Sequence, residues 1–155
     1  LVASSIIRVF EGTIAQMVAL ATLMPIVAGV GGNAGTQTMA VAVRAIATNQ
    51  LTQSNTVRTI LREIRVAFLN GATVAVVIGL GVAFVFANPQ LGMVIAAAMM
   101  TNIVFAGFAG VMVPVILDRL DVDPAVSSSV FVTMITDSMG FFAFLGLATL
   151  ACLTV

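Results

Sequence analysis

The sequence has 155 residues, of which 61% are hydrophobic and 8% are charged, and its mean hydropathy is +1.20. Soluble domains carry about 25% charged residues, so this composition excludes an ordinary soluble globule and indicates an integral membrane protein. Six basic residues balance six acidic ones and no basic tract occurs, which excludes the electrostatic surface that a nucleic-acid-binding protein needs.

Long uncharged stretches predict the membrane-spanning helices, because a span needs about 20 predominantly apolar residues. Residues 1–7 are too short to cross and are expected to be the tail of a preceding helix, in a chain that is part of a longer protein. The sequence thus predicts an all-α, polytopic membrane helix bundle with four full spans plus the tail of a first, or five spans in the intact unit. The four stretches contain no charge except Asp137 and cover residues 13–43, 66–87, 91–117 and 125–155.

The arginines predict the orientation, because short cytoplasmic loops retain basic residues. Segment 44–65 carries four arginines, and turn 118–124 adds Arg119; both lie on one side if the four spans alternate. On the opposite side only Arg8 appears. We therefore expect a multi-pass protein of the cell (inner) membrane, with loops 44–65 and 118–124 cytoplasmic and the C-terminus outside.

An amphipathic helix is expected within segment 44–65. Apolar residues recur there at helical spacing opposite the arginines, so the helix lies at the interface or extends the next span. The simpler interpretation is a surface helix with snorkelling arginines, and the alternative is a lipid-binding or gating role. The apolar residues are Val57, Ile60, Leu61 and Ile64.

The first stretch is too long for a straight crossing, since its 31 residues would form a helix of roughly 46 Å. Pro25 and the four glycines of segment 29–35 predict a break at this glycine-rich motif. Broken helices in membranes line cavities or ion pathways, whereas the alternative use of such glycines is close helix packing. Asn33 and Gln37 are four residues apart and would share one face.

The last stretch contains a carboxylate, Asp137, which costs about 2.5–3.5 kcal/mol to insert and should therefore face protein or water. No predicted span contains Lys, Arg or His, so either Asp137 is protonated and hydrogen-bonded between helices or a transported cation supplies the countercharge. Polar residues at helical spacing form a stripe beside it, typical of a pore wall. They are Ser129, Thr133, Thr136 and Gly140.

The available ligands are all oxygen atoms, which favours Mg²⁺, Ca²⁺ or monovalent ions over soft transition metals. Three aspartates, Asp118, Asp121 and Asp123, crowd the turn before the last stretch. Such a run is either a solvated acidic turn or an electrostatic funnel that concentrates cations at a cytoplasmic mouth.

At these motifs the chain resembles the MgtE magnesium channels and transporters. The resemblance rests on Pro25-Ile-Val-Ala-Gly-Val-Gly-Gly-Asn-Ala-Gly-Thr-Gln-Thr38 with Arg44-Ala-Ile-Ala-Thr48, and on Met134-Ile-Thr-Asp-Ser-Met-Gly140. It implies a homodimeric, five-helix Mg²⁺ channel whose cytoplasmic N-terminal and CBS regulatory domains, absent from this chain, sense Mg²⁺ and close the gate. By this likeness Asp137 corresponds to the carboxylate of the central Mg²⁺ site, Asn33 to a pore-facing amide, and Asp123 to an acidic residue at the cytoplasmic mouth.

The leading hypothesis is passive conduction of hydrated Mg²⁺ through a pore at a homodimer interface. The alternatives are a proton- or sodium-coupled carrier of divalent cations and a membrane-embedded assembly or signalling module without transport. An enzyme is not expected, because there is no histidine, no serine–base pair and no metal triad. Candidate metal ligands are Asp137, Asn33 and Thr133; candidate pore-lining residues are Gly32, Gln37, Ser129, Thr136 and Gly140; the mouth carries Asp118, Asp121 and Asp123.

Overall fold

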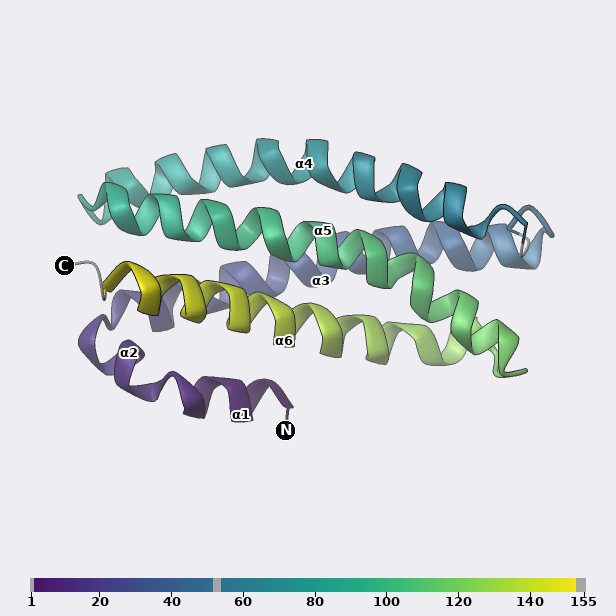
Figure 1. Ribbon diagram of the computed structural model, residues 1–155, viewed down its shortest axis with the longest axis horizontal. Coiled ribbons are helices and arrows are strands. Elements are labelled where there is room, and N and C mark those ends of the chain that lie inside the picture. The colour runs from purple at the N-terminus through teal and green to yellow at the C-terminus, as the bar shows by residue number, and fades with distance from the viewer. Residues whose placement is uncertain (1, 52–53, 153–155) are drawn as a thin grey trace.

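The computed structural model describes residues 2–51 and 54–152, and every regular element within them is a helix. Helices α3 to α6 run side by side along the long axis and alternate in direction, while α1 and α2 lie against α6 (Figure 1). The prediction of an all-α bundle is confirmed. The elements are α1 (Val2–Val9), α2 (Glu11–Gln16), α3 (Ala19–Ala47), α4 (Thr56–Val85), α5 (Pro89–Arg119) and α6 (Pro124–Cys152).

Three of these helices, α4, α5 and α6, are long and apolar enough to cross a membrane. Helix α3 has 29 residues but is not among them, because glycine, threonine and amide side chains dilute the apolar character of its middle. The chain therefore has the helices of a multi-pass membrane protein. The fourth and fifth spans stay predictions.

The expected break at the glycine-rich motif is wrong. Helix α3 continues through Pro25 and the whole motif to Ala47, and no glycine among the described residues has a positive φ. The interruption lies earlier, at Met17, where φ is −137° and ψ is 86° between the end of α2 and the start of α3. Two of the glycines, Gly31 and Gly35, instead allow close packing: a Cβ atom added at Gly35 would lie 2.7 Å from Cγ1 of Val132 on α6.

The α4–α5 and α5–α6 connections are short and built on local hydrogen bonds. Between α4 and α5, the Asn88 side chain accepts a 3.0 Å hydrogen bond from the backbone N–H of Leu91, which caps α5. The connections α3–α4 and α5–α6 lie at one end of the bundle, and α4–α5 lies at the other (Figure 1). The amphipathic segment that begins at Val57 forms the first turns of α4, so it extends that helix.

Helix α5 is the centre of the bundle, since α3, α4 and α6 all pack against it. Small residues make these contacts close. An added Cβ at Gly107 would lie 2.7 Å from Cβ of Ala67 on α4, and one at Gly110 would lie 2.7 Å from Cβ of Thr38 on α3. The core beside them is fully buried, with Val27 and Ile95 both 0% exposed.

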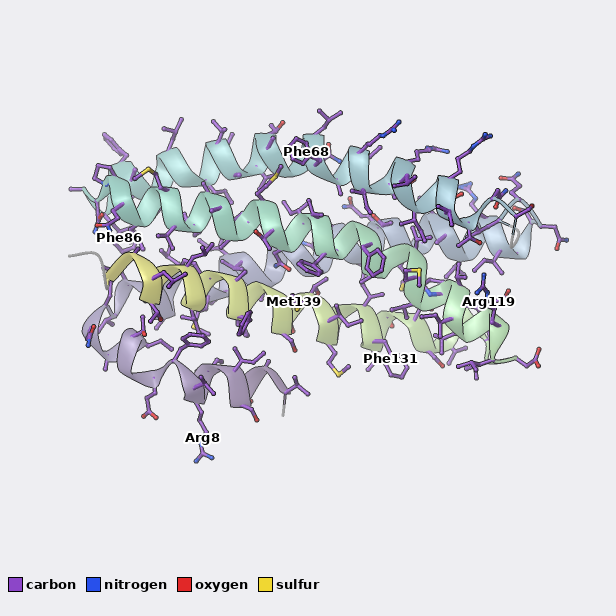
Figure 2. The ribbon with its side chains drawn as sticks, viewed as in Figure 1. Arg8, Phe68, Phe86, Arg119, Phe131 and Met139 are labelled. Carbon is purple, nitrogen blue, oxygen red and sulfur yellow. The ribbon has the colours of Figure 1, made fainter. Side chains whose placement is uncertain are left out.

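The N-terminal helices are held to α6 by side chains. The rings of Phe10 and Phe142 meet edge to face with centroids 6.0 Å apart, and the hydroxyls of Thr13 and Thr149 are 2.7 Å apart. Figure 2 shows Arg8 projecting from α1 away from the other helices.

A candidate cation site where α3 meets α6

Asp137 lies near the middle of α6, in the stretch that the labelled Phe131 and Met139 bracket in Figure 2. Its side chain is half-buried. The one ion pair among residues 2–51 and 54–152 joins Arg62 to Glu63, with Nε and Oε1 3.9 Å apart. In the described part of the chain, Asp137 therefore forms no ion pair with a basic residue, and both expectations for it, a protonated carboxyl group and a countercharge from a transported cation, stay predictions.

The glycine-rich motif of α3 packs directly against the turn of α6 that precedes Asp137. An added Cβ at Gly35 would lie 3.2 Å from Cγ2 of Thr136, and one at Gly32 would lie 4.0 Å from the Thr136 hydroxyl oxygen. Small residues at such a contact let two helix backbones approach closely. The two motifs singled out in the sequence, about 100 residues apart, are therefore neighbours in space.

The polar residues of these two motifs divide into two groups. Asn33, Gln37 and Thr133 are exposed in the isolated chain, and Gly32, Ser129 and Asp137 are half-buried. Gln37 lines a groove of about 190 Å³ together with Glu63 and Asn70 of α4. Gln37 therefore lies on a different side of α3 from the side that meets α6. An ion pathway on the exposed surface of α3 and α6 would be served by Asn33 and Thr133 together with Asp137, whereas the groove at α4 takes Gln37 away from the expected pore lining.

Thr136 and Gly140 face the inside of the bundle, which corrects their expected place on an open pore wall. Thr136 is 0% exposed, and its hydroxyl donates a 3.1 Å hydrogen bond to the carbonyl oxygen of Thr133. Gly140 leaves room for the side chain of Asn102 on α5. Helical spacing alone placed them on the stripe, but α3 and α5 cover that side of α6, so within one chain both residues serve helix packing.

Asp118 in the last turn of α5 and Asp121 and Asp123 in the α5–α6 connection are all exposed at one end of the bundle. Asp123 has a structural contact: its Oδ1 atom accepts a 2.9 Å hydrogen bond from the backbone N–H of Ala125 and so caps the start of α6. Asp121 adopts a φ of 56°, a conformation that aspartate tolerates in tight turns. Their role as a cation mouth, together with Asp118, stays a prediction.

Asn102 is a residue that the sequence reasoning missed. It is fully buried, and its side-chain nitrogen donates a 2.9 Å hydrogen bond to the backbone carbonyl of Val27 on α3. Its Oδ1 atom is buried without a hydrogen-bond partner. The sequence does indicate this residue, because an amide in the middle of the apolar stretch 91–117 is costly in a membrane unless it has a role.

A metal ion here would rely on few charged ligands. No group of three His, Cys, Asp or Glu residues lies close enough together to hold a metal among the residues described. One carboxylate and neutral oxygens suit an ion held through its own water molecules, and Mg²⁺ gives up water reluctantly.

Comparison with known proteins shows the family of the chain. A family model, MgtE, described as a divalent cation transporter, matches residues 24–147, which include the glycine-rich motif and Asp137. Three curated relatives are named Magnesium transporter MgtE. They come from Bacillus subtilis (36% identical over 149 residues, 96% of this chain), Enterococcus faecalis (35% over 147 residues, 95%) and Thermus thermophilus (34% over 150 residues, 97%).

The chain spans about a third of the length of these relatives, 33%, 32% and 33% respectively. The match covers nearly all of this chain and includes both motifs that meet at the α3–α6 contact. The chain belongs to the MgtE family of divalent cation transporters.

Proposed function

We propose that this protein carries Mg²⁺ across the membrane by passive conduction of the hydrated ion. The pathway forms where the exposed faces of α3 and α6 meet the same faces of a second copy. One observation carries the proposal: the glycine-rich motif packs against the turn that precedes Asp137, a half-buried carboxylate without a basic partner in the described chain. Membership of a divalent cation transporter family, with relatives named magnesium transporters, supports the choice of ion.

In this proposal Asp137 holds the ion through its hydration shell. Asn33 and Thr133, both exposed, offer neutral oxygens to the same water molecules. A single carboxylate leaves a divalent ion half neutralised, and a second copy related by a two-fold axis supplies the second negative charge. The dimer is therefore part of the ion chemistry.

The driving force is the membrane potential. An inside-negative potential of 100 mV lowers the free energy of an entering divalent ion by about 4.6 kcal/mol, so no hydrolysis is required. The exposed aspartates of the α5–α6 connection raise the local cation concentration at the cytoplasmic end, provided that this end faces the cytoplasm as the arginines predict.

The test is Mg²⁺ flux into liposomes that contain the protein and an entrapped Mg²⁺ indicator, under an imposed potential. Asp137→Asn and Asp137→Ala should each lower the flux at least about tenfold, because a charge-assisted contact contributes roughly 1.5–3 kcal/mol. Glu11→Gln, which removes an exposed carboxylate on α2, is the matched control and should keep full flux. Unchanged flux in both Asp137 variants would show that the site is misplaced.

The same liposomes separate conduction from coupled transport. Passive conduction predicts a flux that follows the potential and ignores an imposed pH or Na⁺ gradient. A flux driven by either gradient at zero potential would instead identify a coupled carrier.

A further inference from the structure

Three arginines form a stripe on the first half of α4. Arg58, Arg62 and Arg65 follow one another at helical spacing, and all three are exposed. They line a groove of about 520 Å³ that is made by α4 alone. In Figure 2 side chains with blue nitrogen tips project outward from this end of α4.

Ion pairs within the described residues neutralise little of the positive charge of this arginine stripe. Arg62 approaches Glu63 at 3.9 Å, but its side chain is 76% exposed, and exposed ion pairs of this kind are weak. In the described residues Arg58 and Arg65 form no ion pair. The three arginines span about 10 Å along the helix axis, and their side chains are long enough to reach one common ligand.

The same face of α4 becomes apolar beyond the arginines. Leu69, which lines the groove, is 68% exposed, and Val76 and Leu80 continue the stripe at 58% and 68%. From Arg65 to Val76 the helix rises about 16 Å, close to the thickness of one leaflet's hydrocarbon. One exposed face thus passes from cationic to apolar in the order in which a phospholipid passes from headgroup to acyl chain.

We propose that this stripe is a binding site for an anionic phospholipid. The guanidinium groups of Arg58, Arg62 and Arg65 hold the phosphate, and an acyl chain lies along Leu69 and Val76. Charge complementarity selects the occupant, because guanidinium groups bind phosphate oxygens in a bidentate manner and each basic residue near an anionic membrane surface strengthens association about fivefold. The site is independent of the ion that the protein carries.

The experiment compares two variants of equal net charge, which the chain's six arginines allow. One variant changes Arg58, Arg62 and Arg65 to Gln; the matched control changes Arg8, Arg44 and Arg119 to Gln. Each protein is purified in detergent and titrated with phosphatidylglycerol or phosphatidylcholine, and bound lipid is counted by native mass spectrometry. All six substitutions are at exposed positions, so both variants are expected to keep the fold.

The proposal predicts that the unmodified protein and the control bind one phosphatidylglycerol molecule more tightly than phosphatidylcholine. The stripe variant should bind it about a hundredfold more weakly, the product of three fivefold losses. Equal phosphatidylglycerol binding in the stripe and control variants would overturn the site. Equal binding of the two lipids by the unmodified protein would also overturn it, and displacement by inorganic phosphate alone would show a phosphate site without a lipid.

Discussion

The side-chain amide of Asn102 on α5 donates a hydrogen bond to the carbonyl oxygen of Val27 on α3, over 2.9 Å. The same amide lies against Gly31 of α3 and Gly140 of α6, where an added Cβ atom would collide with it. One buried polar side chain therefore connects three helices. Its contact on α6, Gly140, lies three residues after Asp137. We interpret Asn102 as the contact that sets the spacing of the two helices of the candidate site.

Asn102→Ala should destabilise the protein by about 1–2 kcal/mol, because it removes an interhelical hydrogen bond and leaves a small void. The measurement is thermal unfolding in detergent, followed by the helical circular dichroism signal. Thr101→Ala is the control, since the Thr101 hydroxyl donates only to Ala97 of its own helix. Equal stability of the two variants would contradict the connecting role of Asn102.

Gly35→Ala should force α3 away from α6, because the new Cβ would lie 2.7 Å from Cγ1 of Val132. Overpacking of this kind costs about 1–3 kcal/mol, and the displaced helix should also lower Mg²⁺ flux in the liposome assay. Gly81→Ala is the matched control, with no atom within 4 Å of the added methyl group. A Gly35→Ala protein with normal stability and flux would argue against the close α3–α6 contact.

Two roles of Asp123 can be separated by two substitutions. Asp123→Asn retains the hydrogen bond that caps α6 but removes the charge, whereas Asp123→Ala removes both. Only the alanine variant should lose stability, by about 0.5–2 kcal/mol in thermal unfolding. If the carboxylate also attracts cations, both variants should lower flux at low ionic strength and recover at high salt. Normal flux for Asp123→Asn would limit Asp123 to capping.

The proposed dimer interface predicts a pattern of cross-linking. In a chain with Cys152→Ala, Asn33→Cys should be joined to its copy by a short bifunctional maleimide, because Asn33 lies on the exposed face assigned to the second protomer. Val77→Cys is the control, since Val77 is 65% exposed on α4. The covalent dimer is detected by electrophoresis. Cross-linking at Val77 without cross-linking at Asn33 would move the interface to α4.

The sequence predicts the long helices well where apolar stretches are bounded by charged or turn-forming residues. The expected stretch 91–117 and the described part of 125–155 correspond closely to α5 and α6, because Asn88-Pro89 and the aspartate-rich turn end one helix and begin the next; residues 153–155 lie outside the described residues. The sequence does not indicate that α2 ends at Gln16, because the residues on both sides of Met17 are uncharged and the amino-acid composition does not change there.

The sequence indicates the residue types of the candidate site, whose role stays a prediction, but it indicates their geometry only in part. Asp137 was recognisable from the cost of an isolated carboxylate in an apolar helix. The inward orientation of Thr136 was not, because it depends on α3 and α5 covering that side of α6. The glycines of α3 likewise suggest a break until the neighbouring side chains that need the small size of Gly31 and Gly35 are known.

Helix α5 stands between α4 and α6, and α4 is attached to the bundle chiefly through α5. Helix α5 therefore separates the guanidinium groups of Arg58, Arg62 and Arg65 on α4 from the carboxylate of Asp137 on α6, and residues 91–117 of α5 between them are uncharged. On the two proposals made above, substitutions on the outward face of α4 would change lipid binding without disturbing the surroundings of Asp137. Conversely, substitutions at the α3–α6 contact would change cation binding without disturbing the arginine stripe of α4.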